Sequence, residues 1–523
     1  MEKFSLKLFL IVSTLTASSF CATCSYSLSD YGYACELSDA NVVAIDEEME
    51  ILGDHLDGYS FDNVEYLRSS GTIMNFWPKS IFEKFTKLKI IEFQFVSMKQ
   101  IESKNFVNCS DLETIILSTN PIELLPTNLF AQCPNLKKLY FSSNKISSIS
   151  DGAFNGLDNL ETLMLDNNII QTLGSEVLKP LKNLKNLGLQ VTGIFELAEN
   201  LIWSNPKLEQ LQMYSNNIAK IPDDFFKFSS NLKELVLSGN RISEIDDKIF
   251  QPLVNLEILD LKFNGLMEVT AEAFKSMVKL QSLKLESNFL PSIDPLNFAT
   301  LTSLQTLNLF ENQIRNFHED IFASLVNIEE IDISMNLLSE IPPNMFQNNK
   351  KLEILMMNGN NIETFDPETF TRLANLKFLS VNANKISEIH PELLKNNAKL
   401  DTLDLGFNDI AKIDSAAFKT TKDLQLLFLN FNQINAISRD IFEVLPNLFG
   451  LNLLENVCIN KAFSKGELED KSDFNKCFDN YDGGSTTVAT STTETTTLGA
   501  AAIYSTSLLK IVSIIAFVII KCL

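Results

Sequence analysis

Residues 232–255 read LKELVLSGNRISEIDDKIFQPLVN, and the next 24 residues, LEILDLKFNGLMEVTAEAFKSMVK, repeat the same pattern. The shared frame is L-x-x-L-x-L-x-x-N-x-I-x-x-I, followed by Phe at position 19 and usually Leu at position 22. Sixteen such blocks start every 24 residues from 64 to 424, without insertion or deletion, and a partial block begins at 448. An unbroken period of this length predicts a stacked solenoid, in which each repeat packs on its neighbours.

Single positions of the repeat have distinct physical roles. Positions 4 and 6, Leu235 and Leu237 in the quoted block, are apolar between polar neighbours, which is the period-two pattern of a strand. One strand per block, about 4.8 Å from the next, predicts a parallel sheet of roughly 75 Å. Position 9 is Asn in thirteen of the sixteen blocks, and a column of buried amides can satisfy the backbone where each strand ends. Position 19 is Phe in thirteen blocks and predicts a spine of rings.

The pattern over residues 64–456 resembles the leucine-rich repeat family in its 24-residue, extracellular subclass. The resemblance implies an α/β solenoid: a right-handed horseshoe with a long concave parallel β-sheet and a convex face of loops and 3₁₀ turns. The chain is also similar to lipid-anchored insect adhesion members of the family (chaoptin- and connectin-like) and to Toll-like receptor ectodomains. These likenesses imply protein binding at the cell surface.

A few blocks depart from the frame. Thr72 and Val96 replace the position-9 Asn in the first two blocks, as expected near a cap, and Thr192 replaces it in the middle of the array. Leu178 and Ile202 interrupt the Phe column close to Thr192. We therefore expect a local change of curvature over residues 178–205.

The N-terminus has the features of a secretory leader. Residues 1–21 contain two lysines, an apolar run and then small residues, which predicts a signal peptide cut between Ser19 and Ala22. The alternative, a buried first helix, fits less well because the apolar run is short and the array starts much later. Residues 22–63 are expected to form a polar N-terminal cap over the first coil, with Asn41–Ile45 as a first strand.

The C-terminus changes composition in steps. Residues 448–482 are expected to form a partial repeat and C-terminal cap, and 483–498 a Ser/Thr-rich stalk. Residues 499–523 fit a glycosylphosphatidylinositol (GPI) attachment signal, with Gly499 as the attachment residue, or else a membrane segment. Lys510 interrupts the apolar run, which favours the lipid anchor over a single spanning helix, and plain secretion is a third alternative. The predicted location is the extracellular face of the plasma membrane.

The cysteines allow three disulfides in a secreted chain. Cys109 and Cys133 occupy position 22 of adjacent blocks, and equivalent atoms of stacked coils lie about 5 Å apart, which suits a disulfide. The alternative for this pair is two small apolar residues where Leu is usual. Two further pairs are assigned to the caps, Cys24–Cys35 at the N-terminus and Cys458–Cys477 at the C-terminus.

Several function classes are disfavoured. A net charge of −23 with no basic block argues against nucleic acid as a partner. There is no glycine-rich phosphate loop, no G-x-S-x-G and only three scattered histidines, so we expect no enzyme, no metal and no cofactor. Asn108-Cys109-Ser110 is the one N-x-S/T sequon; a glycan on Asn108 is expected, although an unused sequon is the alternative.

Ligand-binding candidates come from the outward positions 3, 5, 7 and 8. Exposed aromatic and apolar side chains on a rigid sheet are typical of interface hot spots, although they can also simply pack on their neighbours. The C-terminal candidates are Phe310, Met335, Met356, Phe378, Phe407, Leu426, Phe428 and Phe431. A second stripe at position 5 consists of Ile116, Tyr140 and Met164, and an acidic set at the same position consists of Asp260, Asp332 and Asp404.

Together these features predict a cell-surface protein that binds a protein ligand, or a second copy of itself, through its concave face. Cell adhesion or surface recognition is the favoured role. An innate-immune or ligand-sensing co-receptor, secreted or tethered and without its own signalling domain, is the alternative. A structural scaffold without a specific ligand is a weaker third reading.

Overall fold

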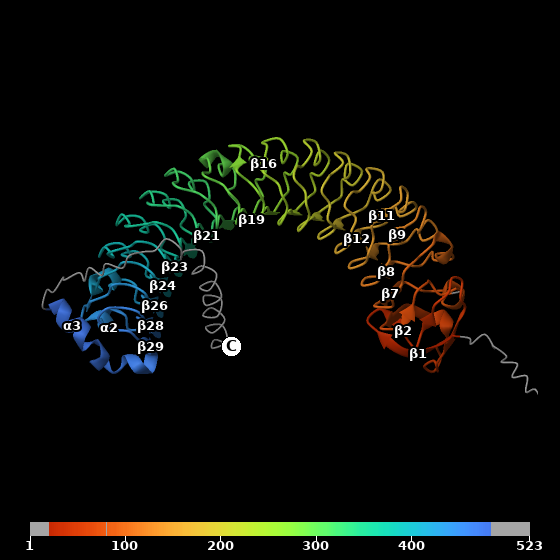
Figure 1. Ribbon diagram of the computed structural model, residues 1–523, viewed down its shortest axis with the longest axis horizontal. Helices are drawn as coiled ribbons and strands as arrows, with labels where there is room; N and C mark the ends of the chain where they lie inside the picture. The colour runs from red at the N-terminus through yellow and green to blue at the C-terminus, as the bar shows by residue number, and fades with distance from the viewer. Residues whose placement is uncertain (1–19, 80, 483–523) are drawn as a thin grey trace, which may run out of the picture.

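The structure is a computed structural model that describes residues 20–79 and 81–482. The chain forms an open arc, with one long sheet on the inner, concave side and turns on the outer, convex side (Figure 1). The sheet has 21 strands. Neighbouring repeat strands are parallel and pair residues 24 positions apart, as Leu235 pairs with Leu259 and Leu403 with Leu427. The predicted repeat solenoid with a long parallel sheet is confirmed.

One strand of the sheet comes from each repeat. From β8 onward these strands cover positions 3 to 5 of the repeat, where a buried Leu or Ile at position 4 lies between two outward-facing residues. The repeat strands are β5 (Val64–Ser70), β7 (Ile90–Gln94), β8 (Thr114–Ile116), β10 (Lys138–Tyr140), β12 (Thr162–Met164), β13 (Asn186–Gly188), β14 (Gln210–Gln212), β15 (Glu234–Val236), β17 (Ile258–Asp260), β19 (Ser282–Lys284), β20 (Thr306–Asn308), β21 (Glu330–Asp332), β22 (Ile354–Met356), β23 (Phe378–Ser380), β24 (Thr402–Asp404), β26 (Leu426–Phe428) and β28 (Gly450–Asn452).

Outside this sheet the secondary structure is short. Four two-stranded parallel pairs are β3 (Asn41–Val42) with β6 (Ile73–Met74), β9 (Leu124–Leu125) with β11 (Ser148–Ile149), β16 (Glu244–Ile245) with β18 (Glu268–Val269), and β25 (Lys412–Ile413) with β27 (Ala436–Ile437). The short helices are α1 (Ile81–Lys84), α2 (Ile441–Val444), η1 (Phe61–Asn63), η2 (Ser103–Asn105), η3 (Pro295–Asn297), η4 (Ser415–Phe418), η5 (Lys465–Leu468) and η6 (Lys471–Phe474).

The N-terminal end of the sheet is closed by a hairpin. Strands β1 (Phe20–Ser29) and β2 (Gly32–Ser38) pair antiparallel and are joined by the Cys24–Cys35 disulfide. Strand β2 continues the sheet onto β5, and β1 pairs with β4 (Met49–Leu52). The edge is therefore built from β4, β1 and β2. The expected first strand at Asn41–Ile45 is reduced to β3, which pairs outside the main sheet.

The core is a continuous stack of buried side chains from the cap to the last coil. The Phe spine is present, with ring centroids 4.6 Å apart for Phe106 and Phe130 and 6.0 Å apart for Phe226 and Phe250. Between these two runs of rings, Leu178 and Ile202 are almost completely buried at the same coil position. Aliphatic side chains thus fill the interrupted part of the spine.

The position-9 asparagines form the expected ladder of buried amides. Asn264 illustrates it: its Nδ2 donates to the carbonyls of Leu237 and Leu261 at 3.0 Å, and its Oδ1 accepts from the Ile242 N–H at 3.1 Å. One side chain therefore joins the turn of its own coil to the preceding coil. Buried backbone groups need such partners, so the ladder stabilises the turn out of the sheet in each coil that has the position-9 Asn.

The coil around Thr192 keeps the sheet register but loses part of this ladder. Strand β13 pairs with β12 and β14 without a shift. The Thr192 hydroxyl donates to the Leu189 carbonyl at 2.8 Å, while Asn216 Oδ1, one coil later, accepts from the Thr192 N–H at 3.0 Å. A hydroxyl has a single donor, so the bonds that an Asn makes to the previous coil are missing here. The expected change of curvature over 178–205 stays a prediction.

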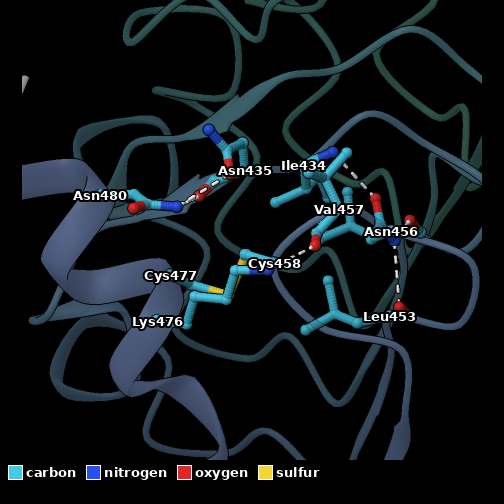
Figure 2. Close-up of a disulfide and its surroundings, with 10 residues drawn as sticks. Ile434, Asn435, Leu453, Asn456, Val457, Cys458, Lys476, Cys477 and Asn480 are labelled. Carbon is cyan, nitrogen blue, oxygen red and sulfur yellow. Dashed lines mark hydrogen bonds between the residues drawn. A yellow bond between two sulfur atoms is a disulfide. The ribbon is translucent and has the colours of Figure 1, made fainter. Parts of the chain in front are cut away.

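The C-terminal end is covered by the antiparallel strand β29 (Ala462–Ser464), which pairs with β28, and by helix α3 (Asn475–Asp482). Figure 2 shows how the Cys458–Cys477 disulfide ties α3 to the last coil, with Asn480 Nδ2 donating to the Asn435 carbonyl at 2.9 Å. Arg439 makes ion pairs with two carboxylates of the helix. The third disulfide, Cys109–Cys133, joins adjacent coils with a Cα–Cα distance of 4.9 Å.

Candidate binding surface

Position 8 of the repeat lies at the turn where each strand leaves the concave sheet. From Gly71 to Glu455, all seventeen residues at this position have a positive φ between 52° and 72°. This left-handed conformation suits Gly and is unfavourable for bulky side chains. Phenylalanine nevertheless occupies the position in four coils, and its ring is exposed in each. These four residues are Phe95, Phe263, Phe407 and Phe431. The repeat pattern alone gave no indication of this backbone conformation.

Phe407 and Phe431 are in consecutive coils and stack on each other. Their ring centroids are 4.3 Å apart and their planes are 13° from parallel. Even so, the two residues remain 40% and 46% exposed. Among the candidates named from the sequence, these are the two that the structure leaves exposed; the others are partly buried. The pair is the centre of the C-terminal candidate surface.

The strand register separates the remaining C-terminal candidates. Met356 on β22 and Phe428 on β26 are at the same position, but Ser380 and Asp404 lie between them. Thr402 likewise separates Phe378 from Leu426. The apolar side chains predicted as one surface therefore divide into two groups. The group nearer the C-terminus contains Phe407, Leu426, Phe428 and Phe431. The group nearer the N-terminus contains Phe310, Met335, Met356 and Phe378.

Some of these side chains cover a glycine of the next coil. A Cβ on Gly359 would lie 2.3 Å from Met335 Sδ, and one on Gly450 would lie 2.9 Å from a Leu426 methyl group. In the N-terminal stripe, a Cβ on Gly188 would lie 2.6 Å from Met164 Sδ. Met335, Leu426 and Met164 therefore have a packing role, and part of their apolar surface is not available to a ligand.

The second stripe is contiguous. Ile116, Tyr140 and Met164 are direct neighbours on β8, β10 and β12. All three are partly buried, and the stripe continues into Gly188 on β13. This arrangement gives a shallow apolar band across three strands.

Between the two C-terminal groups lies a polar network. Ser380 Oγ donates to Asn358 Oδ1 at 2.6 Å, and Asn382 Nδ2 donates to Asp404 at 3.2 Å. Burial raises the pKa of the Asp404 carboxyl, and burial likewise raises the pKa of Asp332. The position-5 carboxylates also bond to their own turns, since Asp332 Oδ1 accepts from the Ser334 N–H at 2.9 Å. The acidic set is therefore part of the coil's internal hydrogen bonding.

The electrostatics of the array change along its length. At position 2, Glu and Lys alternate strictly from Glu65 to Glu257, and then Gln281 and Gln305 end the alternation. Neighbouring coils of this column form ion pairs, for example Lys137–Glu113 at 2.9 Å and Lys233–Glu209 at 2.7 Å. These pairs are exposed and contribute little stability. They do balance the charges of the position-2 column in the N-terminal half of the array.

The described residues contain neither a metal-binding cluster nor a membrane helix. Residues 20–79 and 81–482 contain no group of three or more His, Cys, Asp or Glu side chains placed to hold a metal ion. Over the same residues, no helix is both long and apolar enough to span a bilayer. The residues named for the signal peptide, the stalk and the Gly499 attachment site lie outside the described part, apart from Phe20 and Cys21, which lie in β1. Asn108 is exposed, beside the buried Cys109.

A coiled array of this form, closed at both ends by disulfide-linked caps, defines a repeat-solenoid protein. Two sequence models of leucine-rich repeat families match this chain. The general leucine-rich repeat model matches residues 86–146, 134–194, 326–386, 350–410 and 398–457, and the BspA-type leucine-rich repeat region matches six copies over 219–353. The chain belongs to the leucine-rich repeat family. Its repeat domain is of a kind that typically has no catalytic role.

Solved structures with the same fold come from several kingdoms. The Toll–Spatzle complex of Drosophila has a TM-score of 0.65 at 18% identity, over 83% of this chain and 69% of that chain. A leucine-rich repeat protein of Leptospira interrogans has a TM-score of 0.60 at 24% identity, over 75% and 90%. The ectodomain of the Arabidopsis receptor kinase GASSHO1/SCHENGEN3, in complex with CASPARIAN STRIP INTEGRITY FACTOR 2, has a TM-score of 0.59 at 23% identity, over 82% and 58%. At these identities the likeness shows the fold alone. No curated protein matches the sequence.

Proposed function

We propose that this protein binds a protein ligand at the cell surface through the C-terminal part of its concave face, in cell adhesion or surface recognition. The observation that supports this most directly is the exposed Phe407–Phe431 stack beside Leu426 and Phe428. Clustered aromatic side chains on a rigid sheet bind partners strongly, because little conformational freedom is lost on docking. Toll and the Arabidopsis receptor have both been solved with protein ligands, which agrees with this class of function.

An adhesion role predicts that the full chain makes cells aggregate. Cells expressing the wild-type chain should aggregate, and Phe428→Ala with Phe431→Ala should weaken aggregation several-fold. The melting temperature should change by only a few degrees, because both side chains are at least partly exposed. Phe263→Ala is the matched control for position 8, since Phe263 has the same left-handed backbone and an exposed ring.

The outcome separates the two roles. Aggregation that survives the double substitution contradicts the proposed surface. Wild-type cells that do not aggregate with one another exclude self-adhesion. They leave adhesion to a different cell-surface protein, which would aggregate these cells with cells of another type. They also leave the alternative, a ligand-sensing co-receptor without its own signalling domain, which would bind a soluble or microbial protein. Chaoptin- and connectin-like adhesion and Toll-like sensing are the two family roles that correspond to these outcomes.

We also propose that the chain is held on the outer leaflet by a lipid anchor at Gly499, with a glycan at Asn108. Three disulfides in the described part agree with an extracellular location. Treatment of expressing cells with phosphatidylinositol-specific phospholipase C should release the protein into the medium. Retention on the cells would instead favour a single membrane helix, and its presence in the medium before treatment would favour secretion. A mobility shift on peptide-N-glycosidase treatment, lost in Asn108→Gln, tests the glycan.

A further inference from the structure

We propose that Phe407, Phe431, Asp409 and Glu455 form a docking point for an arginine side chain that a partner protein presents next to an apolar residue. This inference rests on the proposed function, because it states which chemistry the C-terminal part of the concave face recognises. It goes further by naming the cationic group and the carboxylates that would receive it.

The aromatic half of the docking point is the stacked pair. One face of each ring is used in the stack, at 4.3 Å between centroids, and about two fifths of each residue is still open to solvent. The coils hold the rings rigidly, because Phe407 N–H donates to the Asn430 carbonyl and Phe431 N–H to the Leu454 carbonyl, both at 2.8 Å. Leu454, the neighbour of Glu455, is also 40% exposed. The rings and this leucine form an apolar surface across three consecutive coils.

The acidic half lies in the coil of Phe407 and in the coil that follows Phe431. Glu455 is at position 8, one coil after Phe431, so its Cα lies about 5 Å away by the strand spacing. Asp409 follows Phe407 by two residues, and both carboxylates are exposed. In the described part of the chain neither has a Lys or Arg nitrogen within 4.0 Å, although Lys385 is at the position of Asp409 one coil earlier. The Glu455 carboxylate accepts one long hydrogen bond, from Asn460 Nδ2 at 3.4 Å, so it has a neutral partner and no cationic one. This contrasts with the Glu–Lys pairs of the N-terminal coils.

A neutral apolar partner would fit this surface poorly, because covering the rings would also remove water from two carboxylates that have no cationic partner. A cation next to an apolar group satisfies both halves. Arginine is favoured over lysine because its planar guanidinium stacks on an aromatic face and can at the same time donate two hydrogen bonds to a carboxylate. The partner is therefore a protein segment with an Arg beside Leu or a similar residue.

The repeat supplies matched positions where the same side chains lack this combination. Phe263 has the same backbone conformation as Phe431 but lies between Gly239 and Ser287 at position 8, without a second ring. Glu311 is at the coil position of Glu455, is exposed, and accepts from Ser287 Oγ at 2.7 Å. Neither position has two stacked aromatic rings beside it, as Phe407 and Phe431 are beside Glu455.

The test uses the full chain displayed on cells and four biotinylated peptides of sequence SGSLXLSGS, with X as Arg, Lys, Leu or Glu. Each peptide is made tetravalent on fluorescent streptavidin, so that weak binding is measurable. Half-maximal binding is read by flow cytometry at 150 mM NaCl. We expect the Arg peptide to bind best, the Lys peptide less well, and the Leu and Glu peptides about tenfold more weakly than the Arg peptide.

Two variants and two controls assign the binding. Phe407→Ala with Phe431→Ala, and separately Glu455→Lys, should reduce binding of the Arg peptide to that of the Leu peptide. Phe263→Ala and Glu311→Lys should leave it within twofold, with surface expression equal for all variants by antibody staining.

Equal binding of the Arg and Leu peptides would overturn the proposal. An equal loss in Glu311→Lys would also overturn it, because binding would then follow the net charge of the chain. If either occurs while Phe428→Ala with Phe431→Ala still weakens aggregation several-fold, the proposed function stands and only the arginine assignment fails. If aggregation is also unaffected, both fail.

Discussion

At the scale of the residue, the clearest departure from the repeat is Thr192. Elsewhere a position-9 Asn donates to the carbonyl 27 residues earlier and accepts from the N–H 22 residues earlier, as Asn216 does with Leu189 and Ile194. The corresponding groups for position 192 are the Leu165 carbonyl and the Ile170 N–H. Thr192 bonds instead to Leu189 and Asn216. The buried Ile170 N–H is therefore left without the amide acceptor that other coils supply.

Thr192→Asn is expected to stabilise the chain by about 1 kcal/mol, because Asn has a volume similar to that of Thr and restores two buried hydrogen bonds. Amide hydrogen exchange at Ile170 should slow, and the unfolding midpoint in urea should rise. The reverse change in a regular coil, Asn264→Thr, should destabilise by roughly 1–3 kcal/mol, since it leaves buried backbone groups unpaired. Unchanged exchange at Ile170 would contradict this account of the irregular coil.

At the scale of the element, helix α3 and the last coil form one unit. The helix buries Cys477 and Phe478, and the disulfide to Cys458 fixes it against the coil edge (Figure 2). Phe478 stacks on Phe474, whose ring also packs on Phe463 of β29 at 4.7 Å. This cap covers the apolar interior that the final coil would otherwise expose, as a terminal unit of a solenoid must.

Removing the C-terminal disulfide by Cys458→Ser with Cys477→Ser should destabilise the cap by roughly 3 kcal/mol. The two cysteines are 19 residues apart, and the loop between them is no longer closed in the unfolded chain when the disulfide is absent. Hydrogen exchange should increase in residues 424–482 and stay unchanged in residues 232–400, since each coil contacts only its neighbours. Arg439→Ala, which removes exposed ion pairs, should have a much smaller effect. Faster exchange throughout the array would show instead that the cap controls global stability.

At the scale of the whole molecule, the solenoid is a uniform scaffold with a few specialised surfaces. The N-terminal half has a column of alternating Glu and Lys that pair across coils, a narrow apolar band on β8, β10 and β12, and an exposed ring at Phe95. The C-terminal half combines a stacked pair of exposed rings with two carboxylates that have no Lys or Arg partner among the described residues. A rigid arc holds such surfaces at fixed separations, so a partner that contacts both halves would have to match the curvature of the sheet. This division of the surface is what the proposed function depends on.

The fold could be predicted from the sequence because its determinants are local and repeated. The spacing of Leu235 and Leu237 defines a strand, a period of 24 residues defines a coil, and Asn264 and Phe250 recur at the positions where a turn and a core need them. The Cys109–Cys133 disulfide follows from the same period, since equivalent positions of adjacent coils must lie close together.

The candidate site could be predicted only in part, because it depends on which side chains meet between coils. The sequence indicated Phe407 and Phe431, but not that they stack, that their backbone is left-handed, or that Glu455, at the same position in the next coil, has the same left-handed backbone. It grouped Met335 and Leu426 with them, whereas packing places these side chains over Gly359 and Gly450. Periodicity along the chain determines the coil; contacts across coils depend on register and side-chain packing, which no single repeat contains.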